Sequence, residues 1–294
     1  MIDNNNQEIE KIKEDALKFF KGDRNIRNEL NKLNNIYKFK YHNINYYILY
    51  KNKLNLTKIN KIVKRVYKIS YYYNKTFNIY LLLTPLKKLF NSNIYEPLSE
   101  LNINSGFTYL YLNSIYLIRI EELPKVLLHE LIHHNKLIHN EFKKNNIDKL
   151  KDYFKIDKRI YLDPNEAIIE FWACLIHLYY ISIEYNKDYY KLYKNELNYS
   201  LIKSKQILNI QKRLPNKIWI DKNANIFPYI IFKTIFLLYL DEFNNIYTFP
   251  YNDDVITDFL ISHYQPFINF LNIMPLNKIS LNPKSLRFMI YSDY

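Results

Sequence analysis

The sequence predicts an α+β fold, with a small sheet in the first half of the chain and mainly helices after it. Runs of alternating or continuous apolar residues, which are typical of strands, all fall before residue 121. Prolines then open two helical patterns, at residues 124 and 164, and a long apolar segment follows at residues 226–240. An order of strands first and helices later is typical of α+β proteins.

Residues 1–75 are expected to form a mostly helical N-terminal region with one hairpin. Apolar positions at helical spacing predict a helix over residues 9–20, which Gly22 would end. Residues 37–50 alternate in polarity as a hairpin does, with a turn at His42. Thr57 is the candidate N-cap of a second helix with a strongly apolar face.

Residues 76–294 are expected to form a second domain. Its strands are predicted at residues 77–83, 107–112 and 115–120. One helix is predicted over residues 124–138 and another over residues 164–185, and the chain from residue 200 onward is expected to be mostly helical. The domain would therefore combine a small sheet, two central helices and a helical C-terminal part.

Two rare residue types exclude several classes of protein. The 294 residues include only 2 glycines, and Gly22 and Gly106 lie too far apart for a dinucleotide-binding G-x-G-x-x-G or a phosphate-binding P-loop. The single cysteine, Cys174, excludes an intrachain disulfide framework, a Cys-rich zinc finger and a C-x-x-C redox pair.

The chain is strongly basic, with a net charge of +13. Such a balance is typical of proteins that bind nucleic acid or anionic membranes. The abundant residues, Lys, Asn, Ile and Tyr, have A/T-rich codons, and Lys is distributed along the whole chain. We therefore interpret the charge mainly as a bias of composition and do not favour nucleic acid as the partner.

No segment predicts secretion or a membrane anchor. The first ten residues are polar and acidic, unlike a signal peptide. The apolar segment 226–240 is short for a bilayer and contains Lys233, which favours a buried helix of a soluble protein. With a single thiol and no signal, we expect an intracellular protein that has no membrane partner.

The motif with the clearest chemistry is His-Glu-Leu-Ile-His at residues 129–133. Two residues four apart share one face of a helix, so both imidazoles can bind one metal ion. Zn²⁺ accepts nitrogen ligands and leaves a position for water in catalytic sites. Glu130 can then act as the general base on that water. The apolar neighbours Val126 and Leu131 are consistent with a buried helix.

Two positions could supply the third ligand. Glu166 and Glu170 lie four residues apart on the next predicted helix, so one carboxylate could bind metal while the other accepts a hydrogen bond from a liganding imidazole. Alternatively, Glu166 and Asp163 form a purely structural capping box. His139 is the alternative metal ligand, because it matches an extended motif with a third histidine, although Lys136 stands where that motif has glycine. We expect Glu166.

Other residues near these motifs have simpler interpretations. His134 is expected to point away from the metal, either at the surface or beside a ligand. His177 is expected to be a buried, hydrogen-bonded histidine, and Cys174 a core residue. Gly106 suggests a tight turn that tolerates no larger side chain.

Residues 129–133 and the Asn-Glu-Ala-Ile-Ile-Glu at 165–170 resemble the zincin metallopeptidases, specifically the gluzincin branch that includes thermolysin. This resemblance implies a zincin-like fold in which Zn²⁺ is bound by His129, His133 and Glu166. Glu130 would be the catalytic base, and Glu170 would accept a hydrogen bond from His129. The gap between the two motifs is longer than in thermolysin, and Glu170 replaces an aspartate.

The same resemblance implies a peptide or protein substrate. In zincins an edge strand precedes the metal helix and pairs with an extended peptide, which makes residues 115–120 the candidate substrate edge. A weaker likeness, carried by residues 104–108, 118–126, 228–229 and 285–287, links the chain to predicted metallopeptidases of large cytoplasmic DNA viruses such as insect poxviruses. It implies a viral protein in the host cytoplasm or the virion.

Peptide hydrolysis also needs a group that stabilises the oxyanion. Tyr229 is the candidate, and His263, Tyr264 and Arg287 are alternatives; an ordinary aromatic in a buried helix is the favoured interpretation of Tyr229. The alternative function is that of a catalytically inactive zincin-fold protein or a basic protein that binds nucleic acid or builds a virion. The presence of Glu130 favours the enzyme, because a purely structural metal site needs no base.

Overall fold

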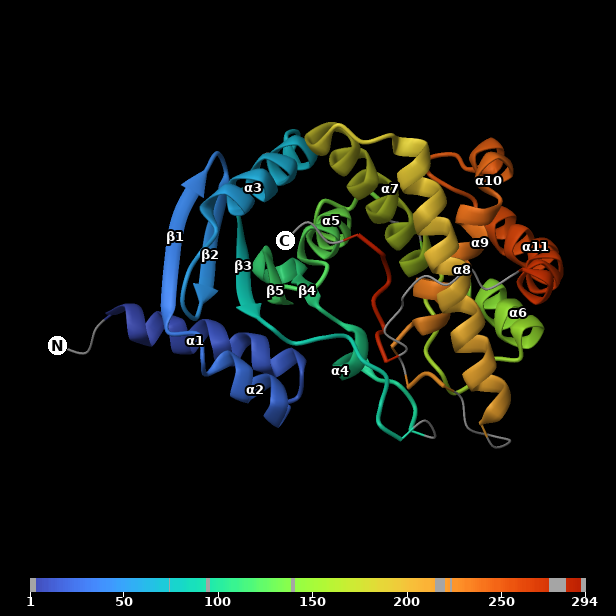
Figure 1. Cartoon of the computed structure of the whole chain (residues 1–294), viewed down its shortest axis with the longest axis horizontal. Coiled ribbons are helices and arrows are strands. Elements are labelled where there is room, and N and C mark those ends of the chain that lie inside the picture. Colours follow the sequence, from blue (N-terminus) through green and yellow to red (C-terminus); the bar gives the residue numbers. More distant parts are fainter. Residues whose placement is uncertain are drawn as a thin grey trace. The chain divides into compact units, whose positions relative to one another are not determined.

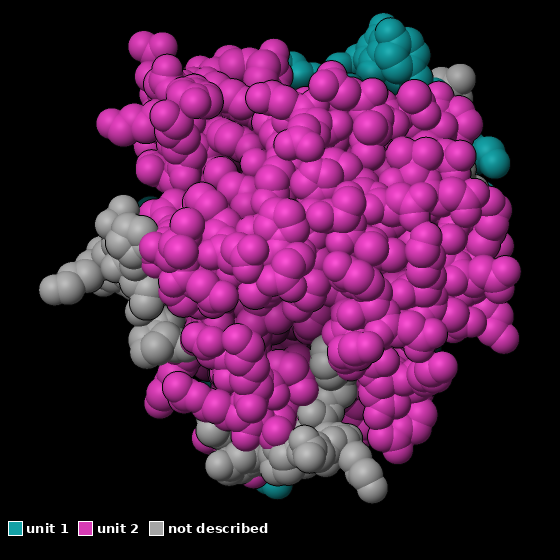
Figure 2. Space-filling model, turned by 90° about the vertical axis from the view of Figure 1, so that its right-hand side faces the viewer, with its two compact units in different colours: residues 1–88, 104–137, 292–294 teal, residues 89–103, 138–291 magenta. Residues whose placement is uncertain are grey.

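The computed structural model of the chain describes residues 4–73, 75–93, 96–138, 141–214, 220–222, 224–274 and 284–291 (Figure 1). These residues form one five-stranded mixed sheet and a larger set of helices, which confirms the α+β prediction. They divide into two compact units, coloured separately in Figure 2. The first unit holds residues 4–88 and 104–137, and the second holds residues 89–103 and 138–291.

These units do not follow the boundary expected near residue 75. The hairpin of β1 and β2 pairs with β3 through β2, so the N-terminal region and the first strand after it share one sheet. A boundary inside a hydrogen-bonded sheet would leave the backbone groups of both new edges without partners. The chain instead passes between the two units after Lys88, after Ile103 and after Leu137.

The sheet has the strand order β1-β2-β3-β5-β4 (Figure 1). The strands are β1 (Asn35–Tyr41), β2 (Ile44–Tyr50), β3 (Phe77–Thr84), β4 (Gly106–Tyr109) and β5 (Ser114–Arg119). The three inner strands are parallel, and both edge strands are antiparallel to their neighbours. The expectation that residues 115–120 form the edge is therefore wrong: β5 pairs with β3 on one side and with β4 on the other, and β4 is the edge strand.

Helices cover both faces of this sheet. Side chains of a strand point alternately to its two faces. Ile115 and Leu117 of β5 therefore pack in one cluster with the helices α3 (Leu56–Ser70) and α5 (Leu123–His134). Tyr116 and Ile118 pack in a second cluster with α1 (Asn4–Phe19) and α2 (Arg24–Leu30). The first unit is thus a sheet between two layers of helix.

Most local predictions for the first unit are confirmed, with two corrections. Gly22 ends α1 with a positive φ of 71°, and its N–H donates to the carbonyl of Leu17. His42 stands in the hairpin turn with a φ of 52°. The N-cap of α3 is Asn55, whose side chain accepts from the N–H of Lys58, and not Thr57. The strand predicted to reach residue 112 ends at Tyr109, after which the chain forms a 3₁₀ turn.

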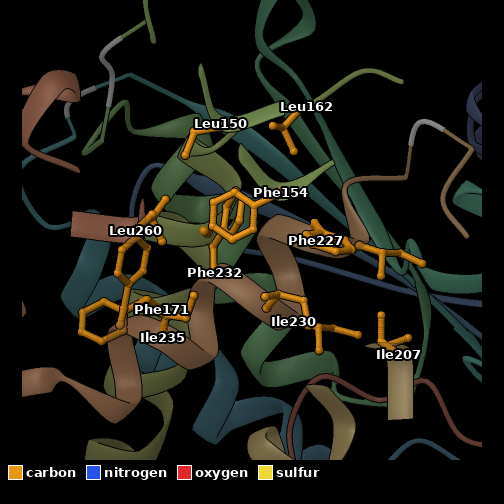
Figure 3. Packing of buried hydrophobic residues seen from close by; sticks show 14 of the residues in the cluster. Leu150, Phe154, Leu162, Phe171, Ile207, Phe227, Ile230, Phe232, Ile235 and Leu260 are labelled. Atoms are coloured by element: carbon orange, nitrogen blue, oxygen red, sulfur yellow. The ribbon is translucent and has the colours of Figure 1, made fainter. Parts of the chain in front are cut away.

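The second unit is helical around a large apolar core. Its elements are α4 (Glu100–Ile103), α6 (Lys144–Phe154), α7 (Asn165–Tyr185), α8 (Tyr189–Arg213), a π-helix η2 (Phe227–Phe232), α9 (Lys233–Leu238), α10 (Leu240–Ile246) and α11 (Asp253–Ile273). Figure 3 shows part of the core, where Phe154, Phe232 and Leu260 lie together. The ring centroids of Phe154 and Phe232 are 4.9 Å apart.

The apolar segment 226–240 lies inside this core, as predicted. Lys233 is buried there, and its ammonium donates to the carbonyl of Phe288 at 2.7 Å and lies 3.5 Å from Glu196. Among the described residues, one helix, α7, is long and apolar enough to cross a membrane, but 61% of its most apolar window is buried inside the protein. A core helix passes the same test of length and composition.

Candidate metal centre

The two histidines of the predicted motif lie on one face of α5 in the first unit. Their Nε2 atoms are 3.2 Å apart, and His129 is buried while His133 is half-buried. A tetrahedral ion with Zn–N distances of about 2.0–2.1 Å would hold two ligand nitrogens about 3.3 Å apart. The Nε2 atoms of His129 and His133 are therefore spaced so that both could bind one such ion.

The position of α5 is fixed by its packing on the sheet. Pro124 stands in the first turn, where its missing N–H costs no helical hydrogen bond. Leu123, Val126, Leu127 and Leu131 pack in the cluster that covers β3 and β5. A helix anchored in this way by one apolar face presents its opposite face, with His129 and His133, as a fixed surface.

Glu130 is held by the edge strand of the sheet. Its Oε2 accepts a hydrogen bond of 2.8 Å from the hydroxyl of Thr108 on β4. Glu130 is buried, at 6% exposure, so the hydroxyl of Thr108 satisfies an oxygen that solvent reaches little. Sequence reasoning assigned no role to Thr108. No local signal identifies it, because the contact joins residues 22 positions apart.

Gly106 allows the helix to approach this strand. A Cβ at this position would lie 2.9 Å from the carbonyl oxygen of Tyr116 and 3.2 Å from the Cγ of Glu130. Gly106 is the first residue of β4 and its φ is not positive, so the expectation of a tight turn is wrong. The glycine is needed because α5 and the neighbouring strand leave no space for a side chain.

Glu166 lies in the first turn of α7 in the second unit and is half-buried. Its Oε2 accepts a hydrogen bond of 2.9 Å from the hydroxyl of Tyr229. Asp163 accepts from the N–H of Asn165 and so serves the start of the helix. The carboxylate of Glu166 is thus directed at Tyr229, which argues against the capping box as its main role.

Tyr229 is positioned by the π-helix η2. Its ring is half-buried and stacks on Phe288 at a centroid distance of 5.2 Å. Short π-helical segments frequently occur at functional sites. Tyr229 is therefore more than an ordinary core aromatic, because its hydroxyl makes a specific contact with a candidate ligand.

Two side chains hold the segment before η2, and one of them also contacts the loop before α7. The buried carboxylate of Asp221 accepts from the N–H groups of Ala224 and Ile226. The side chain of Asn225 accepts from the N–H of Asp163 at 3.0 Å. Burial raises the pKa of Asp221 to about 6, although its two backbone donors act in the opposite direction. The contact of Asn225 with Asp163 joins the segment before Tyr229 to the loop before Glu166, and sequence reasoning did not find Asp221.

The remaining candidate residues lie on α7 or in the later part of the second unit, except for His139. Glu170 is buried on α7, one turn after Glu166, and His177 and Cys174 are buried further along the same helix. Of the alternative oxyanion stabilisers, His263 contacts Glu242 at 2.9 Å, and Arg287 donates to the carbonyl of Ile290. Tyr264 packs on Phe154 in the core. His139 lies outside the described residues.

His134 occupies neither of the places expected for it. It is buried on the opposite face of α5, where its Nε2 lies 2.8 Å from the Oδ1 of Asn113. Its ring packs against Tyr73 and Phe77, at 4.9 and 4.3 Å. Burial lowers the pKa of His134, which favours the neutral ring. It therefore joins α5 to the sheet and serves as an internal comparison for His133.

No family model, curated protein or solved structure matches the chain.

Proposed function

We propose that the chain is a zinc-dependent metallopeptidase with a zincin-like fold that hydrolyses peptide bonds. The observation that carries the proposal is the pair of Nε2 atoms of His129 and His133, 3.2 Å apart, with the carboxylate of the intervening Glu130 held by Thr108. A zinc ion bound there would lower the pKa of its water and polarise the carbonyl of the substrate.

Glu166 is the proposed third ligand. With one ring nitrogen each from His129 and His133, one oxygen of the Glu166 carboxylate would complete a three-ligand set for one metal ion. Two imidazoles and a carboxylate are a ligand set that Zn²⁺ uses in catalytic sites. The hydrogen bond from Tyr229 would fix the orientation of the Glu166 carboxylate, as groups around a metal ligand commonly do. The buried Glu170 is proposed to accept a hydrogen bond from His129.

Glu130 is the proposed catalytic base. Its carboxylate would accept a proton from the attacking water and return it to the amine that leaves. Thr108 would act as a positioning residue, since its hydroxyl already holds one oxygen of this carboxylate and leaves the other available. Tyr229 donates to Glu166 and is therefore proposed as a positioning residue first, and as an oxyanion stabiliser only if its hydroxyl turns toward the substrate.

The edge strand β4 replaces residues 115–120 as the proposed substrate-binding strand. Thr108 lies on β4. Among the described strands, β4 pairs with β5 on one side, and no strand pairs with its other side. An extended peptide could add to such an edge through backbone hydrogen bonds. This would place the scissile bond near Glu130, because Thr108 and Glu130 are already in contact.

The proposal is tested by peptide hydrolysis with a matched pair of variants. Wild-type protein with added zinc is expected to cleave members of a quenched fluorescent peptide library, and a chelator is expected to stop the reaction until zinc is restored. Glu130→Gln is expected to lower kcat/KM by about 10²–10⁴-fold while zinc remains bound. Glu141→Gln, which changes an exposed glutamate of the same charge, is expected to leave the rate unchanged.

Two results would contradict this function. One is the absence of cleavage by zinc-loaded wild-type protein throughout the library. The other is a Glu130→Gln variant as active as the wild type, which would show that the measured hydrolysis does not use this site.

A further inference from the structure

The excess of positive over negative charge lies in one segment of the chain. Residues 30–95 contain 13 Lys and Arg and no Asp or Glu. The rest of the chain contains 29 Lys and Arg and 29 Asp and Glu, so it is neutral overall. Lysine is distributed along the whole chain, but Asp and Glu are absent from residues 30–95, so the excess charge arises from where the acidic residues are missing. Ten of the 13 basic residues lie between the start of β1 and the end of β3, while Lys32 precedes β1, and Lys87 and Lys88 follow β3.

The same segment carries a cluster of aromatic rings in the first unit. The cluster joins the turn between β1 and β2 to the C-terminal end of α3. His42 of the turn stacks on Tyr67 of α3, with ring centroids 4.1 Å apart and planes 15° apart. Tyr41 contacts both rings edge-on, at 4.6 and 5.5 Å, and Tyr71 contacts Tyr67 at 5.5 Å. These contacts hold the cluster in a defined arrangement.

The outer rings of this cluster face solvent. Tyr71 is 58% exposed and Tyr72 is 89% exposed. Both line a depression of about 580 Å³, together with Lys40, His42 and Tyr67. Exposed aromatic rings beside a depression are an arrangement that flat ligands can stack on.

Exposed lysines surround the rings. Lys40 lines the depression, Lys64 lies one turn before Tyr67 on α3, and Lys75 follows Tyr72 in the next loop. Lys38 is excluded from this set, because it forms an ion pair with Glu8 at 2.7 Å. We call the rings of His42, Tyr67, Tyr71 and Tyr72 with these three lysines the aromatic–basic face.

We propose that the aromatic–basic face binds single-stranded nucleic acid, with bases stacked on Tyr71 and Tyr72 and phosphates beside Lys40, Lys64 and Lys75. Every base has a π-face, so tyrosines provide a platform that is independent of sequence, while lysines follow the backbone. The paired bases of a duplex are not free to stack in this way. This function does not depend on the metal centre, since none of these residues is a proposed ligand or base.

The charge and the rings together distinguish this partner from two others. A cationic ligand, which an aromatic cage would otherwise suit, is repelled by a segment with 13 basic and no acidic residues. An acidic peptide would satisfy the lysines, but it would not use the exposed ring faces of Tyr71 and Tyr72. Nucleic acid uses both features.

The test measures binding of a fluorescent 12-nucleotide DNA strand by anisotropy at several salt concentrations. Three phosphate contacts predict a slope of log affinity against log salt of about −2. The double variant Tyr71→Ala/Tyr72→Ala is expected to bind at least about tenfold more weakly, since each base–aromatic stack contributes substantially to affinity. Tyr190→Ala, which removes a ring that is 63% exposed on α8, is the matched control and is expected to have no effect.

A second comparison isolates the charges. Changing Lys40, Lys64 and Lys75 together to Gln is expected to weaken binding and to flatten the salt dependence. Changing Lys144, Lys187 and Lys212 to Gln removes the same charge from exposed positions in the second unit and is expected to change binding little. Tyr71 and Tyr72 are exposed, so their removal should not unfold the protein, and circular dichroism checks this.

Stacking itself is read with 2-aminopurine in the strand, whose fluorescence falls when the base stacks on a ring. Quenching by the wild type and not by Tyr71→Ala/Tyr72→Ala supports the proposal. Three results would overturn it: no binding at low salt, equal binding of a duplex, or equal competition by a poly-glutamate peptide with no effect of the tyrosine variants. The last result would identify the face as a docking site for acidic protein.

Discussion

The histidine part and the glutamate part of the candidate metal centre are held in different ways. In the first unit, His129, Glu130 and His133 lie within five residues of one helix, and the packing of α5 on the sheet fixes all three together. In the second unit, Glu166 and Tyr229 lie 63 residues apart and meet through a loop and a π-helix. The helical repeat alone brings the two histidines together. The orientation of Glu166 depends instead on a long-range hydrogen bond, which the loss of one hydroxyl would break.

The largest expected effect contrasts two neighbouring histidines of α5. His133→Ala should lose zinc binding with little change in stability, because the side chain is half-buried and serves the metal. His134→Ala should keep zinc binding but lose about 3 kcal/mol of the free energy of unfolding, because it removes a buried ring between Tyr73 and Phe77. Elemental analysis and urea unfolding measure the two effects. Equal loss of zinc in both folded variants would show that the two faces of α5 are not distinct.

The next effect tests the polar contact of the second unit. Tyr229→Phe removes only the hydroxyl that donates to Glu166, so zinc affinity is expected to fall about 10–100-fold without unfolding. Competition against a chromophoric chelator measures this affinity. Tyr264→Phe is the matched control, because it removes a hydroxyl from a tyrosine that packs on Phe154. An unchanged affinity in Tyr229→Phe would mean that the hydroxyl does not orient a ligand.

The smallest effect sharpens the comparison within the first unit. Thr108→Val removes the donor to Glu130 and is expected to lower kcat about tenfold, which corresponds to the loss of about 1.4 kcal/mol from one hydrogen bond. Zinc content should not change, because Thr108 contacts the base and no ligand. Thr108→Ser keeps the hydroxyl and should restore most of the rate. A Thr108→Val variant with wild-type kcat would remove Thr108 from the mechanism.

The parts of the fold that depend on local periodicity were predictable. The hairpin at residues 37–50, the strand β3, the helix α5 and the helix α7 all follow from spacing, turn residues and helix-opening prolines. The motif at residues 129–133 needs only the helical repeat to bring its histidines together. Short elements were less clear, and α2 was not predicted. The helix α6 was missed as well, although Ile147, Leu150 and Phe154 have helical spacing.

The parts that depend on contacts between distant residues were not predictable. Strand order is set by pairing across the sheet, and nothing local in residues 115–120 shows that β4 lies outside them. The contacts of Thr108 with Glu130, of Tyr229 with Glu166 and of Asn225 with Asp163 join residues 22, 63 and 62 positions apart. Each needs the tertiary structure, because hydrogen-bonding side chains carry no periodic signal.

The central claim, that Glu166 completes a zinc site begun by His129 and His133, is tested most directly by zinc content. Purified wild type, His133→Ala, Glu166→Ala and the control Glu141→Ala would be loaded with zinc, dialysed and measured by elemental analysis. We predict about one zinc per chain in the wild type and in Glu141→Ala, and a loss in the other two variants. Zinc retained in Glu166→Ala but lost in His133→Ala would contradict the role of Glu166 and favour His139. No zinc in the wild type would contradict the metal centre itself.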